Sequence, residues 1–457
     1  MTILEYYRAN RERFLAGLTD WLKIPSISTL REHQPDVRRA AEFAAHELRG
    51  MGLEQVELIE GKAGQNPLVY GEWLEAPGKP TLLLYGHYDV QPPAPLEEWV
   101  SPPFEPSVRG EDLFARGASD DKGQTYILIK AVEGFLRGEG RLPINVKFLI
   151  EGEEEVGGAH IEAYVSSRPA RLQCDVAVVC DTEMFAPELP TLTTGLRGLV
   201  YTEIEARGAA QDLHSGLYGG AAPNPIQALA HILAGLKGPD GKIRIPGFYR
   251  RVERPSRKEL EAWRRLPFNE KTFLKREVGA AALTGEKGFS VLERLWARPT
   301  LEAHGIRGGF TGEGAKTVIP AVATAKVSMR LVPDMRPSEV IQQYRAAIKR
   351  LTPPGLRTTT RILTAAPASL VSTDNRFIES AAQALEQVFG HKTVYIRGGG
   401  SIPVVGLFGK HLRVPTVLMG FGLPDDRLHS PNEKFHLPNF YRGIEALGRY
   451  FQMVGGT

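Results

Sequence analysis

The chain has 457 residues, a formal net charge of +3, and 42% hydrophobic and 24% charged residues. This length exceeds one ordinary hydrophobic core, so at least two domains are expected, and the composition is that of a soluble globular protein. No basic cluster is interleaved with aromatic residues, and no apolar run approaches the roughly 18 residues that cross a bilayer. We therefore expect neither nucleic acid nor a membrane as a partner.

The first segment and the two cysteines indicate a cellular compartment. The start, MTILEYYRANRERF, is charged too early for a signal peptide and has the pattern of an amphipathic helix. Cys174 and Cys180 lie on and at the end of the apolar run QCDVAVVC, which favours buried free thiols in a reducing compartment. We expect a cytoplasmic protein.

Helix-like and strand-like segments alternate over residues 1–190. Segments with helical periodicity are residues 3–23, 38–51 and 123–137, and short apolar runs are residues 81–87, 144–150 and 175–181. This alternation predicts an α/β fold with a mostly parallel sheet covered by helices on both faces. In such sheets the chemistry usually lies at the carboxyl ends of the strands.

The pattern changes near residue 191. Residues 192–208 alternate like a strand with one exposed face, and a helix with Pro225 near its start follows. A second strand, helix and strand appear between residues 317 and 364. Two such sets predict a two-layer α/β domain, and the stretch 240–312, rich in Arg, Lys, Pro and Gly, is expected to cover the site or an interface.

From about residue 373 the helix–strand rhythm of the first part resumes. The simplest organisation is one catalytic domain, residues 1–190 and 373–457, interrupted by an inserted lid or dimerisation domain, residues 191–372.

His87 and Asp89 stand in LLLYGHYDVQPP at the end of a predicted strand. A histidine with a carboxylate close by is typical of a metal ligand and the partner that orients it. A structural histidine at a strand end is an equally good interpretation of this motif alone.

Asp120 and Asp121 stand in ARGASDDKGQ, a Gly-flanked turn that leads into a predicted helix. One interpretation is a helix cap, because Asp is a preferred N-cap residue. The other is a carboxylate that bridges two cations. The motif alone leaves both open.

The run EGEEEVGG, residues 151–158, follows a predicted strand directly. Glutamate runs are usually solvated, but this one leaves an apolar strand and is closed by two glycines, so at least one carboxylate should point into a crevice. Packing several carboxylates together is costly unless cations neutralise them or a proton is shared. This favours a metal site.

Asp181 ends the strand DVAVVCD, and His429 lies in the loop HSPNEKF before the last helix. With His87, Asp120 and a glutamate of the run, these residues make five ligands at strand ends and loops. Mixed nitrogen and oxygen ligands without thiolates suit catalytic zinc, or Mn or Co as substitutes. Five ligands serve two metals if one aspartate bridges both.

Eight motifs in order resemble the zinc peptidase family of carnosinase, cytosolic nonspecific dipeptidase, aminoacylase and glutamate carboxypeptidase. They are GHYDVQPP, GASDDKG, EGEEEVGG, DLHSGLYGG, KTVIP, RLVPDM, GGSIP and HSPNEKF. The similarity covers almost the whole chain, and DLHSGLYGG and KTVIP point to the dipeptidase branch. The sequence departs from that branch at Gly398, where a Glu is usual.

The resemblance implies two Zn²⁺ per subunit, with Mn²⁺ or Co²⁺ as alternatives. His87 and Asp181 would bind one ion, Glu155 and His429 the other, and Asp120 both. Asp89 would hold the His87 imidazole, and Glu154 would be the general base, in the pattern acid-Glu-Glu-x-Gly anchored at Gly157. Family members have a cis peptide bond after the bridging Asp, so one is expected between Asp120 and Asp121.

The resemblance also implies how substrate binds. His214 would polarise the scissile carbonyl, in many members across a dimer interface, so a homodimer through the lid is expected. The residues expected to hold or approach the substrate's C-terminal carboxylate are Thr317, Arg330, Ser401 and Asn224. The expected substrate is a small peptide, or an acyl-amino acid if the chain is a deacylase. A metal-free binding protein would lack a ligand or the base, and none is missing here.

Overall fold

The chain, described over residues 2–456 by a computed structural model, divides into two compact units. Unit 1 comprises residues 2–194, 371–396 and 402–456, and unit 2 comprises residues 195–370 and 397–401. Within the described residues, no helix is both long and apolar enough to cross a membrane.

Unit 1 is built on a sheet in the order β1-β2-β6-β3-β7-β17-β8. The strands in chain order are β1 (Gln55–Ile59), β2 (Leu68–Trp73), β3 (Thr81–His87), β6 (Asn145–Glu151), β7 (Val176–Val179), β8 (Thr191–Leu196) and β17 (Thr416–Leu418). The central strands β6, β3, β7 and β17 are parallel, and the flanking pairs are antiparallel. The predicted α/β class is confirmed, with parallel pairing concentrated in the centre of the sheet.

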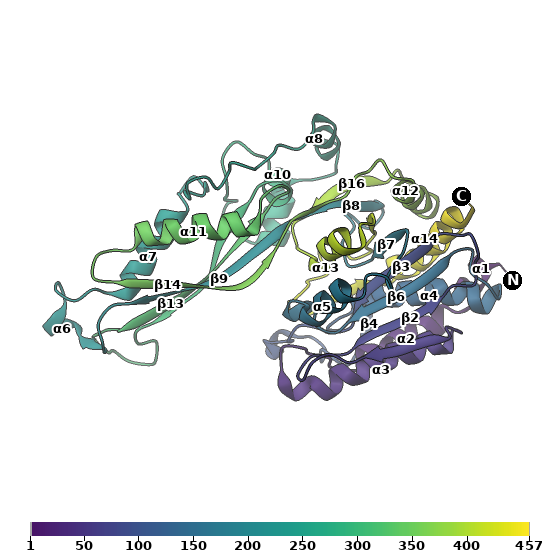
Figure 1. Ribbon diagram of the computed structural model, residues 1–457, viewed down its shortest axis with the longest axis horizontal. Helices are drawn as coiled ribbons and strands as arrows, with labels where there is room; N and C mark the ends of the chain where they lie inside the picture. The colour runs from purple at the N-terminus through teal and green to yellow at the C-terminus, as the bar shows by residue number, and fades with distance from the viewer. Residues whose placement is uncertain (1, 457) are drawn as a thin grey trace. The chain divides into compact units, whose positions relative to one another are not determined.

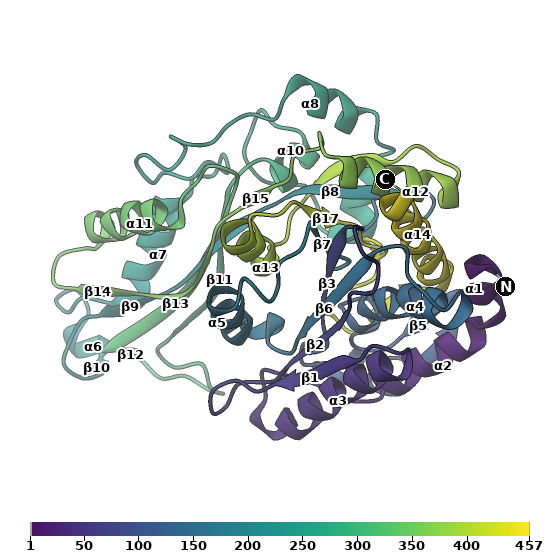
Figure 2. The same ribbon diagram turned by 45° about the vertical axis from the view of Figure 1, so that its right-hand side comes forward.

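Helices cover both faces of this sheet (Figures 1 and 2). Successive strand residues point to opposite faces, so Leu82 and Leu84 join one core with α3, α4, α12 and α14, whereas the Tyr85 ring contacts Phe408 on the other face, 5.9 Å between centroids. The bounds are α3 (Gln34–Gly50), α4 (Lys122–Gly138), α5 (Ala159–Ser167), α12 (Arg376–Phe389), α13 (Pro403–Leu407) and α14 (Leu437–Gly456).

The predicted helix over residues 3–23 is two helices. They are α1 (Ile3–Ala9) and α2 (Arg11–Leu22), separated at Asn10. The Asn10 side-chain amide donates to the Tyr6 carbonyl oxygen at 2.8 Å, beside the Asn10 main-chain N–H that donates to the same oxygen at 3.1 Å, and the Asn10 backbone leaves the helical conformation with a φ of −108° and a ψ of 11°. Hydrophobic periodicity does not reveal this break, because both helices bury residues of the same pattern.

Unit 2 is a two-layer structure. Its antiparallel sheet has the order β11-β13-β9-β14, and α7 and α11 share one apolar core with it. The bounds are β9 (Gly198–Arg207), α7 (Pro225–Leu236), β11 (Thr300–Gly308), β13 (Val322–Leu331), α11 (Pro337–Leu351) and β14 (Arg357–Ala366). The edge strand β11 comes from the Arg- and Gly-rich stretch 240–312, which also holds α8 (Arg257–Arg264) and α10 (Val291–Trp296).

Gly86 allows α4 to start close beside β3. A Cβ atom at Gly86 would lie 1.9 Å from Thr125 Oγ1 and 3.0 Å from Asp121 Oδ2. We expect Gly86→Ala to lower the free energy of unfolding by about 1–3 kcal/mol, the usual cost of overpacking a filled interior. Urea unfolding measures this.

The control is Gly50→Ala near the end of α3, where a Cβ meets no atom within 4 Å. It should keep or raise stability, by up to about 1 kcal/mol, because Ala favours a helix over Gly. Equal stability of Gly86→Ala and wild type would contradict the close packing of β3 on α4.

Candidate metal centre

The polar residues converge where three neighbouring parallel strands end. β3 ends at His87, the short helix η3 (Glu154–Val156) follows β6, and Asp181 lies two residues after β7. Because parallel strands present their carboxyl ends on one edge, these side chains meet there. Asp120, before α4, and His429, before β18 (Lys434–His436), reach the same edge from loops.

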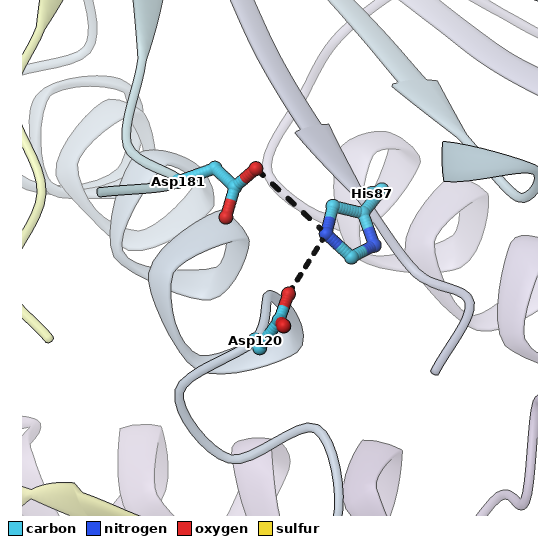
Figure 3. Close-up of side chains that lie close together, drawn as sticks. All are labelled: His87, Asp120 and Asp181. Atoms are coloured by element: carbon cyan, nitrogen blue, oxygen red, sulfur yellow. Dashed lines mark ion pairs between the residues drawn. The ribbon is translucent and has the colours of Figure 1, made fainter. Parts of the chain in front are cut away.

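His87, Asp120 and Asp181 form the first group of three (Figure 3). His87 Nε2 lies 3.1 Å from Asp120 Oδ1 and 4.0 Å from Asp181 Oδ2. His87 Nδ1 lies 3.0 Å from the Asp89 carbonyl oxygen, which places the ring proton on Nδ1. Nε2 therefore faces the two carboxylates, the orientation of a metal-ligating histidine.

Asp120, Glu155 and His429 form the second group. His429 Nε2 lies 3.0 Å from Asp120 Oδ2 and 3.4 Å from Glu155 Oε2. Asp120 thus directs Oδ1 at the first group and Oδ2 at the second. In each group, one ligand atom from every residue lies within 4.8 Å of the others.

The peptide bond between Asp120 and Asp121 is cis, as predicted. Asp121 occupies the N-cap position of α4 but makes no side-chain capping bond. Its Oδ2 instead accepts from the His87 main-chain N–H at 3.0 Å and the Thr125 hydroxyl at 2.7 Å. The helix-cap interpretation is therefore wrong for this side chain, which helps to hold the end of β3.

The three consecutive glutamates have three different environments. Glu153 accepts from the main-chain N–H groups of Asn66 at 2.8 Å and His160 at 3.1 Å, so both of its oxygens are engaged. Glu155 Oε2 accepts from Gln91 Nε2 at 2.7 Å. No donor group among residues 2–456 forms a hydrogen bond to the Glu154 carboxylate. The run is not a solvated face, and Glu154 is the member with an unengaged carboxylate.

Several carboxylates at this edge resist ionisation. Burial, together with Glu151, raises the pKa of Glu154 to about 8, against the lowering effect of His87. Burial and Asp120 raise the pKa of Glu155 well above its ordinary value, and burial and Asp121 do the same for Asp181. Two positive ions between these groups would remove the repulsion and favour the charged carboxylates.

The donor set fits such ions. His87 Nε2 and Glu155 Oε1 are buried atoms, and neither has a hydrogen-bond partner in the described chain. Leaving a buried polar atom unpaired costs about 1–3 kcal/mol, so native structures seldom do so without a ligand. Nitrogen and carboxylate oxygen atoms are ligands that catalytic zinc accepts.

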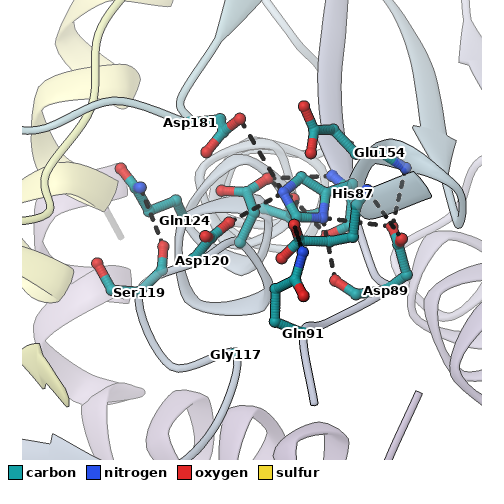
Figure 4. A network of polar contacts seen from close by, with 12 residues as sticks. His87, Asp89, Gln91, Gly117, Ser119, Asp120, Gln124, Glu154 and Asp181 are labelled. Atoms are coloured by element: carbon teal, nitrogen blue, oxygen red, sulfur yellow. Dashed lines mark hydrogen bonds and ion pairs between the residues drawn. The ribbon is translucent and has the colours of Figure 1, made fainter. Parts of the chain in front are cut away.

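Asp89 supports both groups from behind (Figure 4). Its Oδ1 lies 3.4 Å from His87 Nδ1 and accepts from the Glu154 main-chain N–H at 3.3 Å. Its Oδ2 accepts from the Glu155 main-chain N–H at 3.2 Å and from the Ser28 hydroxyl at 2.6 Å. Ser28 lies outside the recognised motifs, and Gln91 lies within GHYDVQPP but is not a usual metal ligand, so no sequence pattern pointed to either residue.

The residues of unit 2 that are predicted to bind substrate lie in separate regions of that unit. Arg330 Nη1 donates to the Ser401 hydroxyl at 2.8 Å. His214 lies in the short pair of β10 (Leu213–His214) and β12 (Val318–Ile319), opposite Val318. The main-chain N–H of the next residue donates to the Thr317 carbonyl oxygen. This pair precedes β13, whereas Arg330 lies near the far end of that strand. At about 3.3 Å per residue, Val322 and Arg330 are about 26 Å apart.

Asn224 has a clear structural task. It is the N-cap of α7, and its Oδ1 accepts from the main-chain N–H of Ile226 at 3.0 Å. Gly398 is the last residue of β16 (Val394–Gly398), three residues before Ser401.

Arg197 is a second guanidinium beside Arg330 that the sequence analysis missed. Its Nε donates to the Gly399 carbonyl oxygen at 2.8 Å. Burial and the charge of Arg330 lower its pKa to about 10. Neither arginine forms an ion pair with a carboxylate of the described chain, so this region of unit 2 carries uncompensated positive charge.

Comparisons with known proteins agree with this geometry. The family model described as peptidase family M20/M25/M40 matches residues 83–453. The Cys-Gly metallodipeptidase of Schizosaccharomyces pombe is 32% identical over 462 residues, covering 98% of this chain and 97% of that protein. The human Beta-Ala-His dipeptidase is 29% identical over 464 residues, covering 98% and 91%.

A solved structure of the dipeptidase Dug1p from Saccharomyces cerevisiae has the same fold. It superposes with a TM-score of 0.90 at 28% identity, covering all of this chain and 98% of that one.

Proposed function

We propose that this chain, which belongs to peptidase family M20/M25/M40, uses two metal ions to hydrolyse the peptide bond of dipeptides. One observation carries the proposal: two groups of metal-type ligands share the single carboxylate of Asp120. The similar proteins of yeast and human are named as dipeptidases and cover nearly the whole chain. This favours dipeptides over N-acyl amino acids as substrates.

We assign His87 and Asp181 to one ion, Glu155 and His429 to the other, and Asp120 to both. Zinc is the proposed ion, with manganese or cobalt able to replace it. When bound, such a pair supplies Lewis-acid activation that lowers the pKa of a water molecule toward neutrality. Asp89 keeps the His87 proton on Nδ1 and leaves Nε2 free for the metal.

Glu154 is the proposed general base. Glu154 is half-buried, and its carboxylate takes no hydrogen bond from the described chain, so an oxygen is available to accept the proton of the attacking water. The same oxygen then delivers this proton to the leaving amine, whose nitrogen must be protonated before it departs.

Unit 2 is the proposed lid and dimerisation domain. Arg330, with Ser401, is proposed to bind the substrate carboxylate, which a guanidinium can hold through two parallel hydrogen bonds. Thr317 is also proposed to hold this carboxylate and Asn224 to lie near it, and His214 is proposed to polarise the scissile carbonyl. His214 lies beyond the Val322 end of β13, and Val322 and Arg330 are about 26 Å apart along this strand, so we infer that one small substrate contacts both only if they come from two copies of the chain. We therefore propose a homodimer, in the cytoplasm.

A substrate panel tests the proposed function. We expect purified protein supplied with Zn²⁺ or Mn²⁺ to hydrolyse Cys-Gly and β-Ala-His, and to cleave N-acetyl amino acids at least tenfold more slowly by kcat/KM. Dipeptides with an amidated C-terminus should also be poor substrates, since they lack the carboxylate. A preference for the acylated amino acids would favour a deacylase instead.

Glu154→Gln tests the general base. The amide cannot accept a proton, so we expect kcat to fall by about 10²–10⁴-fold while both metals stay bound, as measured by dipeptide turnover and elemental analysis. The exposed Glu162→Gln on α5 is the matched control and should be unaffected. Near-wild-type turnover of Glu154→Gln would assign the base to another residue.

Subunit mixing tests whether His214 acts across a dimer. His214→Ala and Glu154→Gln should each be nearly inactive. Mixed dimers contain one site with both defects and one site with neither, if His214 serves the partner's metals. We expect up to half of wild-type activity per mixed dimer, measured after subunit exchange. No recovery despite exchange, followed by native mass spectrometry, would place His214 in its own chain's site.

A further inference from the structure

Glu433, in the motif HSPNEKF, has no role in the chemistry described so far. It is a fully buried carboxylate, 0% exposed, four residues after His429 and directly before β18. β18 pairs with β5 (Asp112–Phe114), and this pairing brings Glu433 beside the loop 115–120 that leads to Asp120.

Both oxygens of Glu433 are saturated by donors. Oε1 accepts from the main-chain N–H groups of Ser119 and Asp120, each at 3.0 Å. Oε2 accepts from Arg116 Nη1 at 2.7 Å and from the Gly117 N–H at 2.9 Å. The buried Arg116 supplies the opposite charge that makes a buried carboxylate tolerable.

This arrangement ties two loops together. One of them carries Asp120, whose main-chain N–H is bound directly, and the other carries His429. His429 has a φ of 59°, which a non-glycine residue seldom adopts, so its loop needs support from neighbouring contacts. By contrast, His87 ends β3 in the middle of the sheet, and Asp181 follows β7, the strand paired with β3.

We propose that Glu433 is a positioning residue that holds Asp120 and His429 in register for the second metal ion. The inference rests on the proposed two-metal function. The second site takes two of its three ligands, Asp120 and His429, from the loops that Glu433 joins. The first site takes only Asp120 from them. Loss of the Glu433 carboxylate therefore weakens the second site more than the first.

Glu433→Gln removes the negative charge and one acceptor oxygen of the side chain but keeps its size. The amide has nearly the same shape, but whichever way it is turned, its NH₂ group meets two donors that previously bonded to an oxygen. At least two hydrogen bonds are lost, and the Arg116 guanidinium is left without its carboxylate. The matched control is Glu133→Gln on α4, a carboxylate 6% exposed that accepts from Lys130 Nζ at 2.6 Å and belongs to no ligand loop.

The experiment follows metal retention in full-length holoprotein. Wild type, Glu433→Gln and Glu133→Gln, each loaded with Zn²⁺, are dialysed against increasing EDTA, and zinc per chain is measured by mass spectrometry. We expect Glu433→Gln to lose one of its two ions at about 10–100-fold lower EDTA, the usual effect of removing a partner behind a ligand. Glu133→Gln should release zinc like wild type, even if its thermal stability falls equally.

A second readout is local. Hydrogen exchange of the Ser119 and Asp120 amides should accelerate in Glu433→Gln and stay unchanged in Glu133→Gln. Wild-type zinc retention by Glu433→Gln would overturn the inference. If Glu433→Gln does not fold, Glu433→Asp, which keeps the charge on a shorter side chain, replaces it. Zinc retention like that of wild type by Glu433→Asp would then overturn the inference. A wild-type chain that holds fewer than two ions would instead refute the two-metal function.

Discussion

Repulsion among buried carboxylates is the constraint on which the rest of this protein depends. Asp120, Glu154, Glu155 and Asp181 meet at one edge of the sheet. Burial raises the pKa of Glu154, Glu155 and Asp181, whereas His429 and His87 lower the pKa of Asp120 against the effect of burial. The surrounding carboxylates Asp89, Glu153 and Glu433 instead have their oxygens bound by main-chain N–H groups or by Arg116. The structure thus separates carboxylates that build the frame from those left open toward a cation.

The sheet explains why these groups lie together. Parallel strands β6, β3 and β7 are almost entirely buried and end at a common edge, so residues far apart in the chain become neighbours. Two loops complete the set, and they need hydrogen bonds rather than strand pairing to hold their shape. The close approach of α4 to β3 at Gly86 belongs to the same frame, because Asp121 and Thr125 occupy the space beside that glycine.

In unit 2, the residues proposed to bind substrate lie toward opposite ends of one strand. Its positive residues, Arg197 and Arg330, lie near one end of β13, and His214 lies beyond the other. A strand of 10 residues cannot bring its two ends to one small substrate. This distance is why we favour an assembly of two chains over a site completed by one chain.

Sequence alone determined the elements with strong periodicity and the residues whose chemistry is visible in a short motif. The buried strands β3 and β6, the helix α4, the α/β class and the cis bond after Asp120 follow from local patterns and from the family resemblance. Tertiary structure decided what local patterns do not encode. It interrupted the first helix at Asn10, turned Asp121 away from capping, and engaged Glu153 with Asn66 and His160. Glu433 reaches Gly117 across 316 residues. Such bonds depend on which distant segments the packed core brings into contact, and a sequence motif contains no record of its partners in space.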